Sequence, residues 1–314
     1  MKLKKPKFWD YHKPNISSNL LLPLSKIFYY LSKIKIKRAE KFNNIKCICV
    51  GNIYLGGTGK TTLSIELKKI LEKENIKVCF IKKDYSDQID EVRLLNQHGK
   101  IFINKDRKKA LREAVSKYYQ VAIFDDGLQD KTISYDLIFV CFNQKNMIGN
   151  GRLIPAGPLR DNLDSLKVNN NIFIIGNNKN NIDLKNILLQ SSKNLNFFEA
   201  SYEPINLEKF DRSINYVVFS GIGNHGTFIE MLKRENFKLI KDFEYPDHYK
   251  YSFSDLNEIS SFSKKYNAQI LTTKKDFLRI DDDYKKNIKY IDIYLEIKQI
   301  KELLKKLKLV YENN

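Results

Sequence analysis

A glycine-rich turn is the part of this sequence whose residue types and spacing best suit chemistry. It lies between the apolar run 47–51, which has the pattern of a strand, and a helix pattern after position 62. Glycines allow successive backbone N–H groups to point inward, and the next helix adds the positive end of its dipole. Such a turn binds nucleotide phosphates, and an ordinary glycine turn is the alternative. The expected nucleotide-binding residues are Gly56, Gly57, Thr58, Gly59, Lys60, Thr61 and Thr62.

Two residues of this turn supply the charge and the hydroxyl that phosphate transfer needs. We expect Lys60 to reach the outer phosphates and the Thr61 hydroxyl to hold Mg²⁺. The match to the pattern G-x-x-x-x-G-K-[ST] is imperfect, because Tyr54 stands at the first glycine position.

A second apolar strand pattern ends in two carboxylates, Asp125 and Asp126, followed by a glycine. A phosphate-loop enzyme uses an acidic residue at such a strand end to hold Mg²⁺, directly or through water. Asp-Asp-Gly is also a common turn. Because it follows a phosphate loop in a chain of alternating elements, we interpret the pair as a metal site and leave open which residue binds directly.

The stretch 149–161 reads Gly-Asn-Gly-Arg-Leu-Ile-Pro-Ala-Gly-Pro-Leu-Arg-Asp. Its prolines and glycines predict a stiff loop that presents Arg152, Arg160 and Asp161 with little conformational entropy left to lose. A rigid surface turn is the alternative.

The composition is strongly basic, with 55 Lys+Arg against 37 Asp+Glu in 314 residues and a formal net charge of +18. This favours an anionic membrane surface as a partner, or else a lysine- and asparagine-rich compositional bias. Nucleic acid ranks lower, because no zinc-finger, RRM or KH signature is present. The four cysteines lie in strand-like runs without a C-x-x-C pair, which favours reduced thiols. We find no secretory signal and no apolar run of membrane-spanning length.

Positions 20–37 have the pattern of an amphipathic helix that could lie on a membrane surface. A helix packed on its own domain has the same pattern, and the residues alone favour that interpretation. The apolar face would carry Leu20, Leu21, Leu24, Ile27, Phe28, Leu31 and Ile34, opposite Lys26, Lys33 and Lys37.

Strand and helix patterns alternate in two series along the chain, separated by an Asn- and Lys-rich stretch at 169–196. This predicts an α/β fold, with a P-loop NTPase-like parallel sheet domain and a second, smaller α/β domain. We place the domains at 1–200 and 201–314, and the final helix, 297–308, fits either. Strands are expected at 78–81, 121–124, 137–142, 216–219 and 269–272, and helices at 63–73, 106–118, 228–235 and 256–266.

Taken together, the motifs resemble the tetraacyldisaccharide 4'-kinase family of lipid A biosynthesis. The resemblance rests on the phosphate loop, the 149–161 loop and four further motifs in one order, and it covers nearly the whole chain. The further motifs are Asp-Asp-Gly-Leu-Gln (125–129), Gly-Ile-Gly (221–223), Asp-His-Tyr (247–249) and Thr-x-Lys-Asp (273–276).

The resemblance implies an enzyme at the cytoplasmic face of the bacterial inner membrane. It would transfer the γ-phosphate of ATP, with Mg²⁺, to the 4'-hydroxyl of a tetraacylated glucosamine disaccharide 1-phosphate. It also implies that the helix at 20–37 contacts the membrane, and it leaves no role for nucleic acid.

The resemblance also assigns candidate residues for the acceptor. Asp90 would orient or deprotonate the attacking hydroxyl, and His248 would assist it. Arg107 matches a family arginine that contacts phosphate. We further expect Gln129, Arg160 and Asp161 to bind substrate.

The chain departs from the family pattern in several places. Lys83-Asp84 stands before Tyr85 where the family has Arg-Gly-Tyr, and the segment that leads to Asp90 is short. Three single departures are His225 for a proline, Lys274 for an acidic residue and Asp130 for a histidine.

Two other classes of protein are alternatives. Deviant P-loop ATPases that position or partition cell components also pair such a loop with a membrane helix. They carry a signature lysine just before the two glycines, where this chain has Leu55. A basic nucleic-acid-binding ATPase is supported by charge alone.

Overall fold

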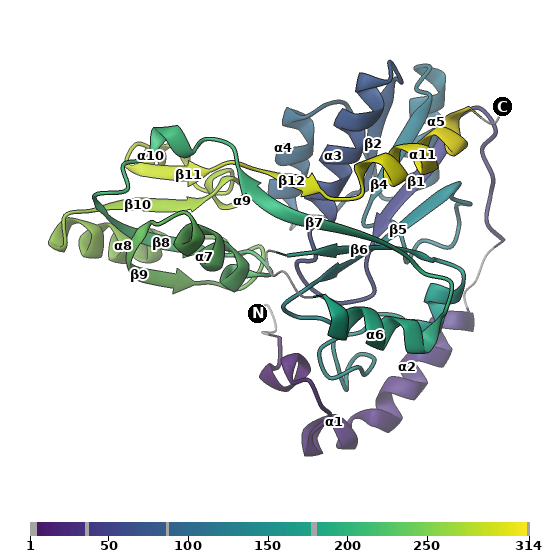
Figure 1. Ribbon diagram of the computed structural model, residues 1–314, viewed down its shortest axis with the longest axis horizontal. Coiled ribbons are helices and arrows are strands. Elements are labelled where there is room, and N and C mark those ends of the chain that lie inside the picture. Colours follow the sequence, from purple (N-terminus) through teal and green to yellow (C-terminus); the bar gives the residue numbers. More distant parts are fainter. Residues whose placement is uncertain (1–4, 35–37, 86–87, 177–180, 313–314) are drawn as a thin grey trace. The chain divides into compact units, whose positions relative to one another are not determined.

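The computed structural model describes residues 5–34, 38–85, 88–176 and 181–312, without the side chains of residues 32–34 (Figure 1). The chain forms two compact units. The first contains Met1–Asp84, Gly99–Ala200 and Ile297–Asn314, and the second contains Tyr85–His98 and Ser201–Glu296.

An eight-stranded sheet has the order β12-β7-β6-β5-β1-β4-β2-β3. Neighbouring strands from β7 to β3 pair in parallel, as the alternating sequence patterns predict. The phosphate loop follows β1 and the acidic pair ends β4, so both lie at the carboxyl edge where α/β sheets bind ligands. The strands are β1 (Lys46–Gly51), β2 (Val78–Lys83), β3 (Ile101–Asn104), β4 (Val121–Asp125), β5 (Leu137–Asn143), β6 (Asn171–Ile175), β7 (Asn196–Pro204) and β12 (Ile293–Ile297).

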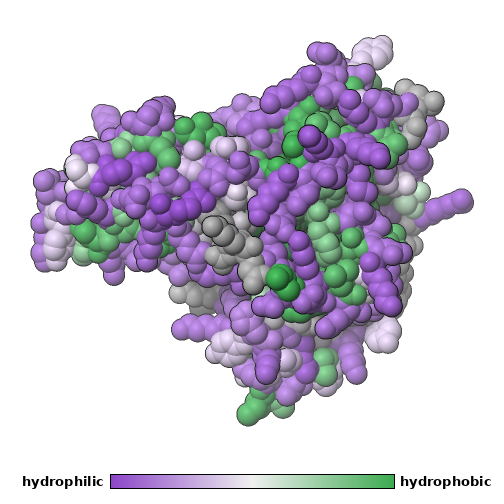
Figure 2. Space-filling model, viewed as in Figure 1, coloured by the Kyte–Doolittle hydropathy of each residue, from purple (hydrophilic) through white to green (hydrophobic). Residues whose placement is uncertain are grey.

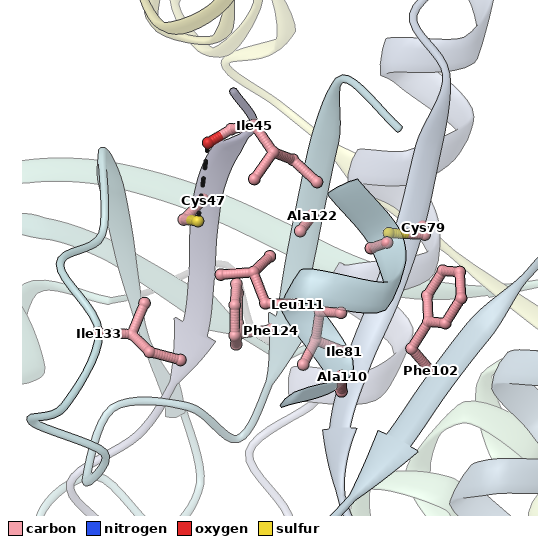
Figure 3. Packing of buried hydrophobic residues seen from close by; sticks show 11 residues of the cluster. Ile45, Cys47, Cys79, Ile81, Phe102, Ala110, Leu111, Ala122, Phe124 and Ile133 are labelled. Carbon is pink, nitrogen blue, oxygen red and sulfur yellow. Dashed lines mark hydrogen bonds between the residues drawn. The ribbon is translucent and has the colours of Figure 1, made fainter. Parts of the chain in front are cut away.

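Apolar side chains of the strands hold the helices of the first unit in place. On one face, α5 packs Ala110, Leu111 and Ala114 against strand residues that include Cys47 and Phe124 (Figure 3). The helix that follows the phosphate loop, α3, contacts β1, β2 and β4. Its Lys68 ammonium lies 5.9 Å from the centre of the Phe80 ring. The helices of this unit are η1 (Lys7–Asp10), α1 (Ile16–Leu20), α2 (Leu22–Ile34), α3 (Lys60–Lys73), α5 (Arg107–Ser116), η2 (Leu163–Lys167), α6 (Ile182–Ser191) and α11 (Ile300–Tyr311).

The second unit is built on a four-stranded parallel sheet with the order β11-β10-β8-β9. Two clusters of buried apolar residues involve its central strands, one with α7 and one with α8. Its elements are α4 (Ile89–Gln97), η3 (Leu207–Lys209), β8 (Asn215–Ser220), α7 (His225–Arg234), β9 (Lys238–Glu244), α8 (Phe253–Lys265), β10 (Ala268–Thr273), α9 (Lys274–Phe277), α10 (Asp282–Lys285) and β11 (Ile288–Ile291).

The predicted fold class is confirmed, and the expected strands correspond to β2, β4, β5, β8 and β10. The division of the chain differs from the expected 1–200 and 201–314 in two places. Residues 85–98 group with the second unit, because α4 packs against α9 of that unit. Residues 297–314 group with the first, where Leu303 and Leu307 of α11 are fully buried.

The N-terminal helices show only part of the predicted amphipathic pattern. Helix α2 ends at Ile34, and Lys37 lies outside the described residues, as do the side chains of Lys33 and Ile34. Within the described chain, no helix is both long enough and apolar enough to span a membrane.

Candidate active site

The phosphate loop has the backbone shape that its glycines allow. Gly56 and Gly59 have φ angles of 134° and 82°, which residues with a Cβ atom rarely adopt. Gly59 is the N-cap of α3, so this helix begins at Lys60 and its first free N–H groups lie at the loop. Thr58 is buried, and its hydroxyl accepts a hydrogen bond of 2.8 Å from Asn52.

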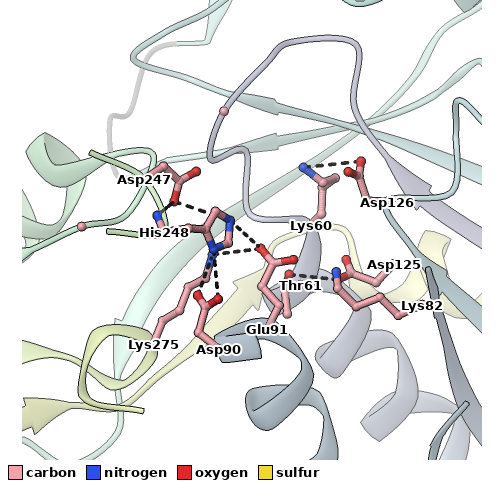
Figure 4. A network of polar contacts seen from close by, with 12 residues as sticks. Lys60, Thr61, Lys82, Asp90, Glu91, Asp125, Asp126, Asp247, His248 and Lys275 are labelled. Atoms are coloured by element: carbon pink, nitrogen blue, oxygen red, sulfur yellow. Dashed lines mark hydrogen bonds and ion pairs between the residues drawn. The ribbon is translucent and has the colours of Figure 1, made fainter. Parts of the chain in front are cut away.

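The acidic pair lies beside the two chemically important residues of the loop (Figure 4). The Thr61 hydroxyl donates to Asp125 over 3.2 Å, and the Lys60 ammonium lies 3.7 Å from Asp126. Burial alone would raise the pKa of Asp126, but Lys60, Arg160 and Lys82 outweigh it and lower the pKa to about 2. Asp126 is therefore a carboxylate at neutral pH.

Asp125 offers a buried carboxylate oxygen to a metal ion. Its side chain is fully buried, and its Oδ1 atom has no hydrogen-bond partner within the described part of the chain. Residues 5–34, 38–85, 88–176 and 181–312 hold no cluster of three or more His, Cys, Asp or Glu side chains suited to a metal ion. Mg²⁺ that arrives with nucleotide phosphates needs only one or two protein ligands, so Asp125 and the neighbouring hydroxyl fit it.

Asn52, which was not among the expected site residues, joins the three predicted motifs of this unit. Its side-chain amide donates to Thr58 in the phosphate loop, and its backbone carbonyl accepts a hydrogen bond of 2.9 Å from the Gln129 side chain of the acidic motif. The Arg160 guanidinium donates to the Asn52 side-chain oxygen and, over 2.9 Å, to Asp126. The structure thus brings Gln129 and Arg160 to the phosphate loop, while Asp161 lies 3.9 Å from Lys131.

The N-terminal helices hold the 149–161 loop in its conformation. The Trp9 indole N–H donates to the Pro155 carbonyl over 3.0 Å. The Ser18 hydroxyl donates to the Ala156 carbonyl over 2.7 Å, and the Ala156 N–H donates to the Ser25 hydroxyl over 2.9 Å. Helices α1 and α2 are therefore part of the support of this site.

Arg107 lies in a different environment from the one expected of a phosphate-contacting residue. Its side chain is buried, and its two terminal nitrogens donate to the Asp126 carbonyl (2.7 Å) and to Asp130 (3.3 Å). Asp130, which departs from the family pattern, is thus a partner of Arg107. These contacts indicate that Arg107 supports the turn at Asp126, which has a left-handed φ of 58°.

In the second unit, the structure brings together Asp90 and His248, which are 158 positions apart in sequence. Asp90 is in the first turn of α4, and the His248 Nδ1 atom lies 3.0 Å from its Oδ1 atom (Figure 4). His248 has a left-handed φ of 56°, and its backbone N–H donates to the Gly221 carbonyl over 3.0 Å. The two residues that the resemblance assigns to the acceptor are therefore in contact with each other.

Two cations also lie beside Asp90, one in the Thr-x-Lys-Asp motif (273–276) and one three residues after it, and no role was expected for either. The Lys275 ammonium lies 3.5 Å and the Arg279 Nε atom 3.4 Å from the Asp90 Oδ2 atom. Burial alone would raise the pKa of Asp90, but the His248 hydrogen bond and these two charges lower it to about 2. The lysine of the motif was the sequence signal for this role.

The remaining motif residues of this unit stabilise the loops that carry His248. Asp276 is fully buried and accepts hydrogen bonds from Gly221 N–H (2.9 Å) and Tyr251 OH (2.7 Å). The two other departures also have partners. His225 lies 2.7 Å from the Ser220 hydroxyl, and Lys274 pairs with Asp292 over 2.7 Å.

Residues 17–310 match the family described as "Tetraacyldisaccharide-1-P 4'-kinase". A protein of Pelagibacter ubique named "Tetraacyldisaccharide 4'-kinase" is 52% identical over 314 residues, which cover 100% of both chains. A Rickettsia canadensis protein of the same name is 34% identical and covers 95% of this chain and 94% of its own.

One solved structure has a similar fold along nearly the whole chain. It is a crystal structure of LpxK from Aquifex aeolicus, described as an "apo" form in complex with ATP. The TM-score is 0.69 at 21% sequence identity, and the match covers 94% of this chain and 99% of the other. This likeness shows that the two proteins share a fold.

Proposed function

Because the chain belongs to the tetraacyldisaccharide-1-P 4'-kinase family, we propose that it transfers the γ-phosphate of ATP to the 4'-hydroxyl of a tetraacylated glucosamine disaccharide 1-phosphate. The observation that carries this proposal is the contact of Lys60 and Thr61 with the acidic pair at the end of β4. That arrangement suits electrostatic stabilisation of a phosphate in transfer.

In this proposal the first unit binds the nucleotide. The N–H groups of the loop and the first turn of α3 bind phosphate oxygens, and Lys60 neutralises charge on the outer phosphates. Thr61 and Asp125 hold Mg²⁺, which neutralises phosphate charge when it is bound. Asp126 holds Lys60 and Arg160 in place, because it pairs with both.

The second unit supplies Asp90, which we propose to orient the acceptor hydroxyl through a hydrogen bond. A carboxylate with a pKa of about 2 is a weak base. This is sufficient for phosphate transfer, because the transition state is loose and asks for position more than for early proton removal. His248 fixes the Asp90 carboxylate through its Nδ1 atom.

The direct test is to incubate the purified protein with γ-labelled ATP, Mg²⁺ and the tetraacylated disaccharide 1-phosphate. A labelled lipid with one additional phosphate is the expected product. The matched control is a lipid with the same four acyl chains but without a free 4'-hydroxyl. Label found only as free phosphate, with either lipid, would make the protein an ATPase of another class.

The acidic pair gives a prediction about metal dependence. Replacement of Asp125 by asparagine is expected to raise the Mg²⁺ concentration needed for half-maximal turnover by about tenfold or more, since a neutral amide binds a hard cation less well. Asp126→Asn should lower turnover with a smaller change in this concentration, because Asp126 mainly pairs with Lys60 and Arg160. A Mg²⁺ titration of the initial rate measures both effects, and equal Mg²⁺ curves for both variants and the wild type would remove the metal site from this pair.

We also propose that α1 and α2 lie on the cytoplasmic face of the bacterial inner membrane, where the acylated acceptor is concentrated. One side of these helices is fixed to the 149–161 loop by Ser18 and Ser25. The opposite side exposes large apolar side chains, and Figure 2 shows hydrophobic residues at the surface in this lower part of the view. An apolar face beside a cation such as Lys26 suits an interface with anionic lipid. The exposed residues are Ile16, Leu20, Leu24, Ile27, Phe28, Tyr30 and Leu31.

A quadruple substitution tests this membrane contact without loss of the loop. Deletion of the first 37 residues would also remove the contacts of Trp9, Ser18 and Ser25, so it would disturb the site itself. Changing Leu24, Ile27, Phe28 and Leu31 to serine is expected to weaken binding to anionic vesicles by at least roughly 100-fold, because each side chain stabilises the bound state when it is buried. The KM for lipid should rise while the KM for ATP stays the same.

Flotation with phosphatidylglycerol-containing vesicles measures this binding, and Tyr118→Ser with Val168→Ser is the matched control. Both of these residues are 85% exposed in other parts of the first unit. High salt should release the wild-type protein only in part, since salt screens the lysines but leaves the apolar contact. Unchanged flotation of the quadruple variant would show that the membrane contact lies elsewhere.

A further inference from the structure

Lys82 is a buried cation near the phosphate loop, and it has no part in the proposed reaction. It lies near the end of β2, and its side chain is 1% exposed. Parallel pairing of β2 with β4 matches Ile81 with Phe124, so Lys82 lies opposite Asp125 at the carboxyl edge of the sheet. Lys82 projects to the same face of the sheet as Phe80, and Phe80 lies beneath α3.

The Lys82 ammonium contacts one oxygen of the carboxylate that we propose as the metal ligand (Figure 4). Its Nζ atom lies 2.7 Å from the Asp125 Oδ2 atom, the same oxygen that accepts from the Thr61 hydroxyl. The other oxygen, Oδ1, is buried and has no partner in the described part of the chain. The Asp125 oxygen nearest the Thr61 hydroxyl is thus already paired with the Lys82 ammonium, although the same hydroxyl is a proposed metal ligand.

A divalent cation at this place would meet the positive charge of Lys82 beside a buried carboxylate. Repulsion between the two cations is strong there, because a buried pair is little screened. A nucleotide reverses this balance, since its phosphates bring several negative charges to Lys60 and to the first turn of α3. The Lys82 ammonium can then donate to phosphate oxygens and share Asp125 with the metal.

We infer that Lys82 is a positioning residue that occupies the Asp125 carboxylate until nucleotide binds, so that the divalent cation enters with the nucleotide and not before it. This inference rests on the proposed function, because it takes Thr61 and Asp125 as the metal ligands. The simpler reading is that Lys82 only balances the charge of Asp125 for stability, as buried ion pairs do. The two readings differ in what a metal does at the nucleotide-free protein.

Titration of Mn²⁺ into nucleotide-free protein, with free Mn²⁺ followed by electron paramagnetic resonance, separates them. Without nucleotide, the wild-type protein and Asp125→Asn are expected to bind Mn²⁺ equally weakly. With a non-hydrolysable ATP analogue, the wild-type protein should bind Mn²⁺ more tightly than Asp125→Asn does. Lys82→Met, which keeps the length of the side chain but not its charge, should bind Mn²⁺ without nucleotide at least about tenfold more tightly than the wild type. A further Asp125→Asn change should abolish that gain.

Lys68→Met is the matched control, because Lys68 is also a buried lysine at the inner side of α3 but pairs with Glu72. It should leave Mn²⁺ binding unchanged. Nucleotide-free wild-type protein that binds Mn²⁺ tightly at Asp125 would overturn the inference, and this measurement does not depend on the folding of any Lys82 variant. Equal binding by the wild type and a folded Lys82→Met protein would also overturn it.

Lipid phosphorylation by the wild-type protein, measured in parallel, keeps the inference apart from the proposed function. If the wild-type protein phosphorylates the lipid, but Lys82→Met and the wild type bind Mn²⁺ with equal affinity without nucleotide, only the inference is refuted. Nucleotide-dependent Mn²⁺ binding without any lipid phosphorylation would leave the inference in place and refute the proposed acceptor.

Discussion

Replacement of Lys60 by alanine is expected to lower the rate of lipid phosphorylation by at least about 100-fold, as removal of one preorganised charge from a transfer site commonly does. Lys60 opens α3 and is positioned by Asp126 at 3.7 Å, so its ammonium is already in place when negative charge shifts during transfer. The loss should appear mainly in kcat, because other donors of the loop still bind the nucleotide.

The control for this variant is Lys69→Ala on the same helix. Lys69 is more exposed and pairs with Glu66 over 2.8 Å, so its loss should leave the rate near that of the wild type. Circular dichroism and the Tm of both variants show whether the fold is kept. A folded Lys60→Ala protein with a normal rate of phosphorylation would refute the assignment of the phosphate loop.

The sequence predicted the parts of the first unit in which local pattern and tertiary structure agree. The glycine turn, the strand that ends in Asp125 and the helix after Lys60 each follow from nearby residues. Parallel order of the strands followed from their alternation with helices. The segment 85–98 was expected in the first unit but groups with the second, because packing of α4 against α9 is a long-range contact that no local pattern contains.

The candidate site shows the same limit. Resemblance to a family paired Asp90 with His248, but only the structure shows that Lys275 and Arg279 complete the group. Asn52 was missed because an asparagine after a strand is an ordinary turn residue, and its three motif contacts come from separate segments. Arg107 was expected at a phosphate because the resemblance matched it with a family arginine, and a motif match does not show that its guanidinium donates to the Asp126 carbonyl and to Asp130.

The N-terminal stripe illustrates why a helix pattern leaves two interpretations open. Its periodicity fits both a helix packed on its own domain and a helix on a membrane. In the structure the polar residues Ser18 and Ser25 make the contacts with the 149–161 loop, while five residues of the predicted apolar face are exposed: Leu20, Leu24, Ile27, Phe28 and Leu31. A hydropathy pattern reports which side is apolar, but it does not report which side faces the protein.

Replacement of Asp90 by alanine is expected to lower kcat by about 100-fold or more, with little change in the KM for ATP, because Asp90 acts on the acceptor hydroxyl. His248→Ala should cause a smaller loss. The double variant should be little worse than Asp90→Ala, because the histidine acts through the carboxylate that it contacts at 3.0 Å. Asp282→Ala, an exposed carboxylate of the same unit that pairs with Lys285, is the control.

The pH dependence of Lys275→Met separates this charge network from a purely structural one. Lys275 lies 3.5 Å from Asp90 and helps to hold the pKa of that carboxyl at about 2. Loss of the positive charge raises the pKa of Asp90, so the carboxylate becomes protonated, and turnover falls, at a higher pH than in the wild type. We therefore expect the acid limb of the kcat profile to move upward in pH for Lys275→Met and to return toward its original position in Lys275→Arg, which keeps the charge. An acid limb at the same pH in Lys275→Met and the wild type would show that Lys275 does not act through Asp90. Fully additive losses of kcat in the Asp90 and His248 variants would show that these two residues do not act together on the acceptor.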